Sequence, residues 1–264
     1  MKIGFIGLGN MATAMLGGII EKGLYKSSEI IGSAKTEATA ERVAQKYGVE
    51  ACTDNKRVAK SADVIVLAVK PIFMEEVISE IRDSVDESKL VISIAAGKSL
   101  EWIEERFGKP IRLVRCMPNT PAMVGAACTC VCLKPDTGKE DEELTLKLME
   151  SFGTATVLPE RLMDAFAAVA GSSPAYVFMF IEAMADAAVL AGIPRKQAYE
   201  FAAQSVLGSA RLMLETGMHP GELKDMVCSP GGTTIEAVKV LEEQGMRAAV
   251  IDAIGACVEK SRLL

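Results

Sequence analysis

The sequence has few of the residues that build metal sites. It contains one histidine, His219, and seven cysteines without a CxxC pair. Because zinc sites need several Cys or His ligands at close spacing, we expect no metal site. We interpret the cysteines as small buried hydrophobic residues in a reducing compartment. The alternation of Cys128, Cys130 and Cys132 predicts that the three share one face of a strand.

Runs of basic charge and long apolar segments are also missing. The chain has 29 basic and 35 acidic residues, a net charge of −6, and no basic run or basic helix face, which argues against nucleic-acid binding. The apolar run after Met1 and Lys2 is short and ends at a glycine, so it does not resemble a signal peptide. No apolar run reaches the length needed to cross a membrane. We therefore expect a soluble cytoplasmic protein.

The first half of the chain alternates between two kinds of pattern. Short apolar, β-branched runs predict strands at residues 2–6, 29–32, 64–69, 90–94, 112–116 and 126–133. Amphipathic segments predict helices at residues 11–22, 37–47, 73–84, 100–107 and 140–152. Such alternation is typical of βαβ units around a parallel sheet.

The second half, after Pro159, is predicted to be entirely helical. Helices are expected at residues 162–191, with an interruption at "GSSPAY", and at 195–216, 220–227, 234–244 and 246 to the end. They are apolar on most sides, which a small isolated domain cannot bury, so we expect self-association. The predicted fold class is α/β, an N-terminal Rossmann-type doubly wound sheet followed by an all-α C-terminal dimerisation domain.

The segment "GFIGLGNMA" follows the first strand and opens the first helix. Gly7-x-Gly9-x-x-Ala12 is the dinucleotide fingerprint in its proper context. Gly7 permits the tight turn, Gly9 lets a pyrophosphate approach the backbone, and Ala12 allows close packing of helix and strand. The pyrophosphate then lies at the helix N-terminus. The alternative is a tight strand–helix turn that binds nothing.

The end of the second strand distinguishes two nicotinamide cofactors. NAD enzymes usually place Asp or Glu there, whereas this chain has Ser33, Ala34 and Lys35. A hydroxyl and a cation suit a 2′-phosphate, so the sequence favours NADPH, with NADH as the alternative. The alternative is that Lys35 is only a solvated side chain near the start of a helix. The segments "AVKP" and "AAG" also end strands, where the ligands of open α/β sheets bind, and we expect Lys70 to contact the cofactor.

A second loop, "CSPGGTT", precedes a helix in the C-terminal half. Gly231 and Gly232 free the backbone to form an anion-binding nest, and Ser229 and the threonines add hydroxyls. This pattern predicts a site for a small carboxylate, and the alternative is a plain turn with Thr as the N-cap. The sequence shows no Ser–His–Asp set or paired carboxylates, so hydrolysis lacks support. Hydride transfer needs no protein nucleophile.

Together these motifs resemble the pyrroline-5-carboxylate reductases over essentially the whole chain. The resemblance rests on "GFIGLGNMA", "AVKP", "SIAAG", "RCMPNTP", "GSSPAYVF" and "HPGELKDMVCSPGGTTIEAVKVLE". It implies NAD(P)H-dependent reduction of 1-pyrroline-5-carboxylate to L-proline, the last step of proline biosynthesis. It also implies a dinucleotide-binding Rossmann domain at residues 1–159 and a helical substrate-binding and dimerisation domain at residues 160–264. The latter interlocks with a partner in a homodimer that often assembles into a decamer.

The resemblance also implies residue roles. The cofactor contacts are Ile6, Gly7, Leu8, Gly9, Asn10, Met11, Ser33, Lys35, Asn55, Ala68, Val69, Lys70, Pro71, Ala95, Ala96 and Gly97. The substrate contacts are Glu160, Ser229, Gly231, Gly232, Thr233 and Thr234. Thr234 is the catalytic candidate, because it would hydrogen-bond the ring nitrogen and help deliver the proton. Many family members have Arg at the position of Lys35, and Lys lacks the bidentate phosphate contact of Arg.

Two alternative functions require different residues in the sequence. A β-hydroxyacid dehydrogenase needs a Lys followed four residues later by Asn in a helix of its second domain, and "GSSPAYVFMFIEAMADA" has neither residue. A redox sensor that binds the dinucleotide without turnover needs the first loop but not "SPGGTT". The intact second loop therefore argues against the sensor.

Overall fold

The computed structural model describes residues 1–263, and within them it separates into two compact units. The first unit comprises residues 1–171 and 258–263, and the helical unit comprises Ser172–Cys257. The predicted division at Pro159 remains a prediction.

The first unit is built on a sheet of eight strands in the order β3-β2-β1-β4-β5-β6-β7-β8. The strands are β1 (Ile3–Ile6), β2 (Ile30–Ser33), β3 (Glu50–Cys52), β4 (Val64–Leu67), β5 (Leu90–Ser93), β6 (Arg112–Met117), β7 (Ala127–Leu133) and β8 (Gly153–Val157). All neighbours pair in parallel except β6 and β7, which are antiparallel. The strand order reverses between β1 and β4, where open α/β sheets bind ligands beyond the carboxyl ends of their strands.

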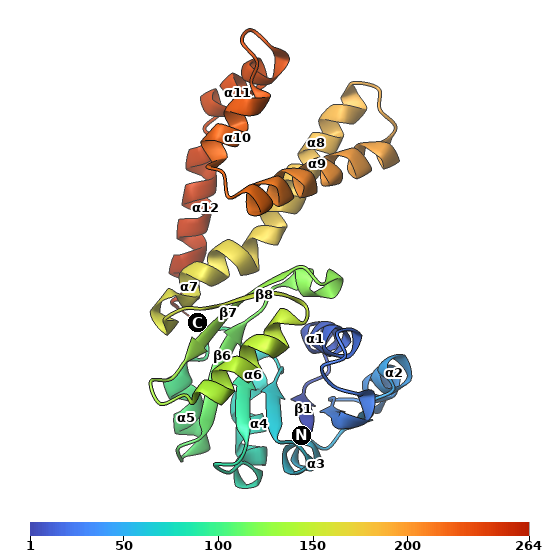
Figure 1. The fold of residues 1–264 in the computed structure, drawn as a ribbon, viewed down its shortest axis with the longest axis vertical. Helices are drawn as coiled ribbons and strands as arrows, with labels where there is room; N and C mark the ends of the chain where they lie inside the picture. The colour runs from blue at the N-terminus through green and yellow to red at the C-terminus, as the bar shows by residue number, and fades with distance from the viewer. Residues whose placement is uncertain (264) are drawn as a thin grey trace. The chain divides into compact units, whose positions relative to one another are not determined.

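Helices cover both faces of this sheet (Figure 1). Buried residues of α1 (Asn10–Glu21), α2 (Glu37–Tyr47) and α6 (Lys139–Glu150) join one hydrophobic core. Those of α3 (Asn55–Ser61), α4 (Met74–Ile81) and α5 (Leu100–Phe107) join the core on the opposite face. The strands β1, β2, β4 and β5 are buried on both faces, which explains their continuous apolar runs. The predicted doubly wound α/β class is confirmed.

Local capping determines where two of these helices begin and end. The Thr36 side chain accepts a hydrogen bond from the N–H of Thr39 at the start of α2, and Ser99 accepts one from Trp102 at the start of α5. Both helices end at a glycine in the left-handed conformation, Gly48 and Gly108. Their bounds are those predicted from the sequence, because hydroxyl N-caps and glycine C-caps are strong local signals.

Other elements differ from the prediction. The strands β3 and β8 and the helix α3 were not predicted, because each is short and two of them lie at the edges of the sheet. Cys130 and Cys132 are buried on β7, and burial raises the pKa of the Cys116 thiol. Cys128, however, is exposed near the start of β7, so the prediction that the cysteines are buried is wrong for this residue.

The helix expected to break at "GSSPAY" continues. A π-helical segment, Ala167–Ser172, joins α7 (Met163–Phe166) to α8 (Ser173–Leu190), and Pro174 lies at the start of α8, where its missing N–H is tolerated. As a result, the stretch Glu160–Leu190 is long and apolar enough to cross a membrane by length and composition alone. The expectation that no segment reaches this length is wrong, because it assumed the interruption.

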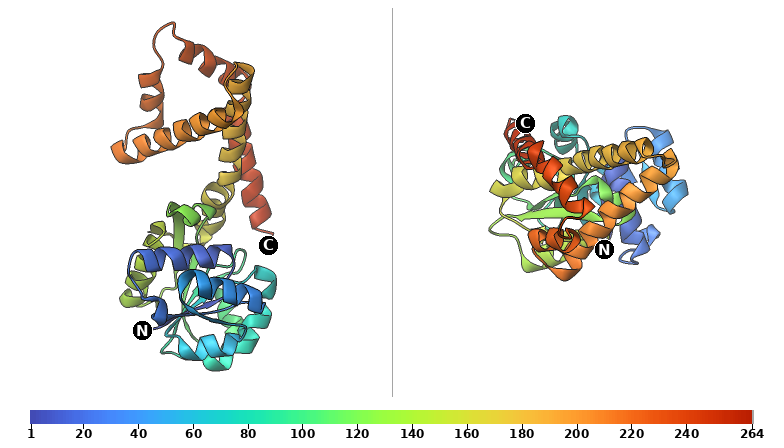
Figure 2. Two further views of the ribbon diagram at one scale, coloured as in Figure 1. Left: turned by 90° about the vertical axis from the view of Figure 1, so that its right-hand side faces the viewer. Right: turned by 90° about the horizontal axis from the view of Figure 1, so that it is seen from above.

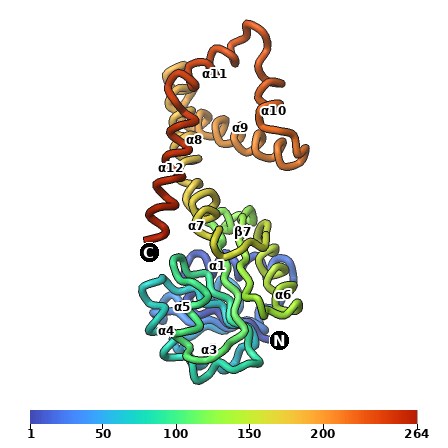
Figure 3. Tube along the Cα trace, turned by 90° about the vertical axis from the view of Figure 1, so that its left-hand side faces the viewer, coloured from blue at the N-terminus to red at the C-terminus, as the bar shows by residue number. Residues whose placement is uncertain are grey.

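The helical unit comprises α8, α9 (Arg195–Thr216), α10 (Pro220–Val227), α11 (Thr233–Glu243) and most of α12 (Met246–Ser261). A short turn joins α8 to α9, which pack on each other (Figure 2). The loop between α10 and α11 contains the "CSPGG" segment (Figure 3). The only histidine, His219, caps α10: its Nδ1 accepts a hydrogen bond from the N–H of Gly221 at 3.1 Å.

This unit has almost no core of its own. Its buried hydrophobic residues are Ala185, Ala198 and Ala202, all with small side chains. Large side chains face outward, including Phe178 at 66% exposure and Leu214 at 81%. Exposure of many large apolar side chains is typical of a unit that forms a protein interface.

Close packing of β7 and β8 generates a stability prediction. A Cβ atom added at Gly153 would lie 2.1 Å from the carbonyl oxygen of Ala127, the residue that it pairs with. We expect Gly153→Ala to lower the free energy of unfolding by about 3 kcal/mol, measured by chemical denaturation. The control Gly138→Ala adds its methyl group in open space and should cost less than about 1 kcal/mol. Equal midpoints for the two variants would contradict this close approach.

Candidate functional site

The glycine loop between β1 and α1 has the geometry of a dinucleotide-binding turn. Gly7 has φ = +98°, and a Cβ atom there would lie 2.7 Å from the carbonyl oxygen of Ala68. Gly9 is the N-cap of α1 and is exposed, and a Cβ there would meet no atom within 4 Å. The first turn of α1 has no side-chain cap and no acidic residue. Its N–H groups are therefore open to an anion.

The other residues predicted in this loop have distinct positions. Ile6 is fully buried and Leu8 is 2% exposed, so only their backbone atoms can face a ligand. Asn10 is exposed and Met11 is partly buried in the first turn of α1. Ala12 is 1% exposed and packs against the sheet, as the fingerprint requires.

A cavity of about 270 Å³ lies beside this loop, at the end of β2. It is lined by Gly7, Ser33, Ala34, Lys35, Thr53, Asn55, Val69, Phe73, Glu76, Val77 and Glu80. The structure thus brings together Gly7, Ser33, Lys35, Asn55 and Val69, which the sequence predicted as cofactor contacts. The residues present fit the ribose end of a dinucleotide, because a glycine turn, a cation and hydrogen-bonding side chains surround one space.

Electrostatics in this cavity are mixed. The Lys35 ammonium lies 4.8 Å from the centre of the Phe73 ring, so a cation–π contact holds it at the cavity. Lys35 is the one cation among the lining residues that the structure describes, and Glu76 and Glu80 are the anions. A 2′-phosphate therefore meets both attraction and repulsion here.

Sequence reasoning missed the contribution of the segment after "AVKP" to this cavity. Phe73, Glu76 and Glu80 all line it and come from α4 and the turn before it. A signal was present, since positions 73, 76, 77 and 80 lie on one side of a helix. The cofactor contacts predicted after β4 lie at the end of this strand and extend only as far as Pro71.

The predicted contacts after β4 and β5 lie at the carboxyl ends of these strands. Ala68 directly follows β4, and its carbonyl approaches Gly7. Lys70 is exposed, and Pro71 begins a 3₁₀ turn, Pro71–Phe73, that leads into α4. After β5, Ala95 is buried, Ala96 is exposed, and Gly97 has φ = +68°.

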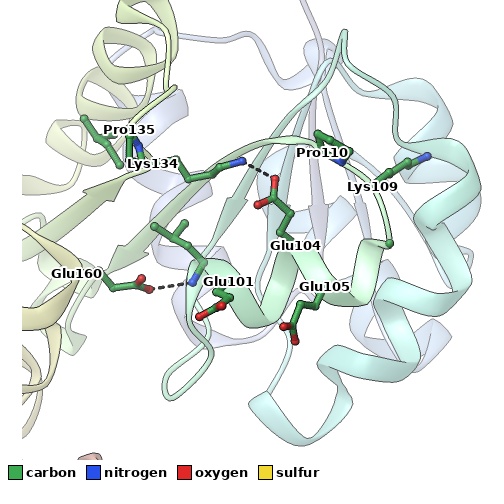
Figure 4. A pocket seen from close by; sticks show the side chains of 11 residues that line it. Glu101, Glu104, Glu105, Lys109, Pro110, Lys134, Pro135 and Glu160 are labelled. Carbon is green, nitrogen blue, oxygen red and sulfur yellow. Dashed lines mark hydrogen bonds and ion pairs between the residues drawn. The ribbon is translucent and has the colours of Figure 1, made fainter.

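Glu160, predicted near the substrate, is engaged within the first unit. Its Oε1 accepts a hydrogen bond from Arg115 Nη1 at 2.7 Å. It also accepts one from the backbone N–H of Leu100 at 2.9 Å (Figure 4). The Arg115 side chain is 7% exposed and that of Glu160 is 30% exposed. Glu160 also lines a cavity of about 690 Å³ along α5, where Lys134 and Glu104 form an ion pair. The carboxylate therefore neutralises a buried guanidinium and caps α5.

The second predicted loop lies in the helical unit. Gly231 has φ = +66°, and Gly232 is the N-cap of α11 without a side-chain hydrogen bond. The alternative of a Thr N-cap is therefore wrong. Thr233 begins α11 and is exposed, Thr234 follows half-buried, and Ser229 is exposed. The open first turn of α11 is chemically suited to a carboxylate.

Known protein families match the chain in both of the regions that contain these loops. Residues 2–97 match the family model "NADP oxidoreductase coenzyme F420-dependent", and residues 160–264 match "Pyrroline-5-carboxylate reductase dimerisation". The pyrroline-5-carboxylate reductase of Escherichia coli K12 is 51% identical over 263 residues, 100% of this chain and 98% of its own length.

Two solved structures are similar over nearly their whole length. A pyrroline-5-carboxylate reductase from Coxiella burnetii has a TM-score of 0.93 at 38% identity, covering 99% of this chain and 97% of the other. The Plasmodium falciparum pyrroline carboxylate reductase, solved with NADP bound, has a TM-score of 0.89 at 31% identity, covering 100% and 97%.

The fold, the glycine loop and these matches define the class: the chain is an oxidoreductase that binds a nicotinamide dinucleotide. It belongs to the pyrroline-5-carboxylate reductase family.

The position of Glu160 generates a prediction that separates two roles. If Glu160 serves to pair Arg115, Glu160→Ala leaves a buried charge and lowers the free energy of unfolding by about 2 kcal/mol. In Glu160→Gln the side-chain oxygen can still accept the hydrogen bond from the Leu100 N–H. This variant should therefore lose less free energy of unfolding than Glu160→Ala. Denaturation followed by the fluorescence of Trp102, the single tryptophan, measures both. Unchanged stability combined with a raised KM for substrate would instead support a direct substrate contact.

Proposed function

We propose that this enzyme reduces the imine of 1-pyrroline-5-carboxylate to give L-proline, using NADPH or NADH. The observation that carries the proposal is the open N-terminus of α11 behind Gly231 and Gly232, in a chain with a dinucleotide turn at Gly7. The family membership supports it. The specific roles of the site residues and the location in the cytoplasm stay predictions.

On the cofactor side, the backbone of the first loop binds and orients. The N–H groups of Asn10 and Met11 in the first turn of α1 receive the pyrophosphate. When bound, the nicotinamide supplies the hydride that reduces the imine carbon. The preference for NADPH predicted from Lys35 is opposed by Glu76 and Glu80 in the same cavity.

On the substrate side, the backbone of the second loop binds the carboxylate. The N–H group of Thr233, in the open first turn of α11, faces the anion, with the Ser229 hydroxyl beside it. The Gly232 N–H donates to the Ser229 carbonyl at 3.0 Å and thereby closes the turn of the loop. The Thr234 hydroxyl hydrogen-bonds the ring nitrogen and holds a proton there. The imine nitrogen becomes a secondary amine on reduction, so a donor at this atom stabilises the developing product.

Self-association completes the proposal. The large exposed apolar side chains of the helical unit need a partner, and a second copy of the same unit provides matching surface. The match of residues 160–264 to a dimerisation family supports this choice of partner. We propose an interlocked homodimer in which the apolar stretch Glu160–Leu190 is covered by protein rather than lipid. Assembly into a decamer stays a prediction.

The direct test of this function is a turnover assay. We expect the loss of nicotinamide absorbance on addition of 1-pyrroline-5-carboxylate, with NADPH and NADH measured in parallel. The product is identified as L-proline by chiral chromatography. The proposal would be contradicted by folded protein that binds NADPH or NADH but shows no turnover with either of them. That result would favour a redox sensor.

The role of Thr234 has its own test. Thr234→Ala should lower kcat/KM by at least about fivefold, because one hydrogen bond to an imine nitrogen contributes on the order of 1 kcal/mol. The Kd for NADPH should change little, since the loop belongs to the substrate site. Thr234→Ser keeps the hydroxyl and is the matched control. Kinetics of Thr234→Ala equal to those of the parent enzyme would refute the assigned role.

A further inference from the structure

A chain of hydrogen bonds crosses the cavity at the end of β2. Ser33 Oγ donates to Asn55 Oδ1 at 2.7 Å, and Asn55 Nδ2 donates to Glu80 Oε2 at 2.7 Å. Ser33 is the last residue of β2, Asn55 is the first of α3, and Glu80 lies near the end of α4. Three separate elements thus converge on one amide.

The direction of this chain is determined by Glu80. An ionised carboxylate only accepts hydrogen bonds, so the NH₂ group of Asn55 must face it. The carbonyl oxygen of Asn55 then faces Ser33, and the Ser33 hydroxyl must donate its single proton to that oxygen. Ser33 is fully buried in this arrangement. Its hydroxyl therefore has no proton left for any other acceptor.

This direction matters for the choice of cofactor. A 2′-phosphate is a hydrogen-bond acceptor that carries negative charge, whereas a 2′-hydroxyl is also a donor. In this hydrogen-bonded chain, the Ser33 proton is not available to a phosphate. The Glu80 carboxylate lies in the same cavity. Lys35 is left as the attractive charge.

We propose that Glu80 is a specificity-determining positioning residue, which sets the balance between NADPH and NADH by fixing the direction of the Ser33–Asn55–Glu80 chain. The inference rests on the proposed function, because it assumes that this cavity receives the ribose end of the dinucleotide. Glu80 acts through Asn55 and disfavours the 2′-phosphate. Neutralising it lets the amide turn, so that Asn55 donates to Ser33 and the Ser33 proton becomes free.

The experiment compares two isosteric variants that remove the same charge from the same cavity. Glu80→Gln loses the carboxylate bonded to Asn55, whereas Glu76→Gln loses a carboxylate for which the structure gives no bond to Asn55. The dissociation constants of NADPH and NADH are measured by fluorescence titration of the full-length protein. Unfolding midpoints verify that both variants are folded.

We expect Glu80→Gln to shift the ratio of the two constants toward NADPH by about tenfold, the effect of one hydrogen bond to a charged group. Glu76→Gln should shift it by about threefold at most, as a screened charge does. Equal shifts in the two variants, or no shift in Glu80→Gln, would overturn the proposal. Equal shifts would assign the effect to charge alone.

A double-mutant cycle tests the proton of Ser33 directly. Ser33→Ala in the Glu80→Gln background should reverse most of the gain for NADPH, and its effect in the parent background should be at least about threefold smaller. Additive effects would overturn the role of chain direction. Because binding is measured without substrate, absence of turnover with 1-pyrroline-5-carboxylate would refute the proposed reaction and leave this result standing.

Discussion

The turn at Gly7 is the constraint on which the ligand-binding edge of the sheet depends. Its N–H donates to the Ser33 carbonyl at 3.0 Å, and its α-carbon lies so close to the Ala68 carbonyl that a side chain has no space. One residue thus ties together the carboxyl ends of β1, β2 and β4. This tie sets where α1 begins and places Ser33 beside the first turn of α3. Any side chain at position 7 would separate these strand ends, and the cavity between them would lose its shape.

Both candidate binding loops use backbone rather than side-chain charge. α1 and α11 begin at Gly9 and Gly232, and neither helix has a side-chain cap. By contrast, α2 and α5 are capped by Thr36 and Ser99, which satisfy the N–H groups that a ligand would otherwise use. Glycine at the N-cap keeps these donors available and lets a phosphate or a carboxylate approach closely. Such donors carry no formal charge, so selectivity between ligands depends on the few ionised side chains nearby.

The sequence predicted those features that depend on local chemistry. The bounds of α2 and α5 follow from their caps, and the two glycine loops follow from spacing. β3 and β8 were missed because short edge strands depend on pairing with a neighbour more than on their own pattern. The contact of Asn55 with Glu80 was missed for a similar reason, since the two residues lie 25 positions apart and meet only through the packing of α3 and α4. The bond between Glu160 and Arg115 likewise arises from tertiary structure.

The near absence of a core in the helical unit links folding to the presence of a partner. A unit whose buried hydrophobic residues are alanines gains little free energy from its own packing, so its stabilisation comes from association. The folding of this part of the chain is then a second-order process, and its stability rises with protomer concentration. Dilution therefore lowers the stability of this part of the chain. In the proposed homodimer, a newly made chain exposes its apolar helices until it meets a second copy.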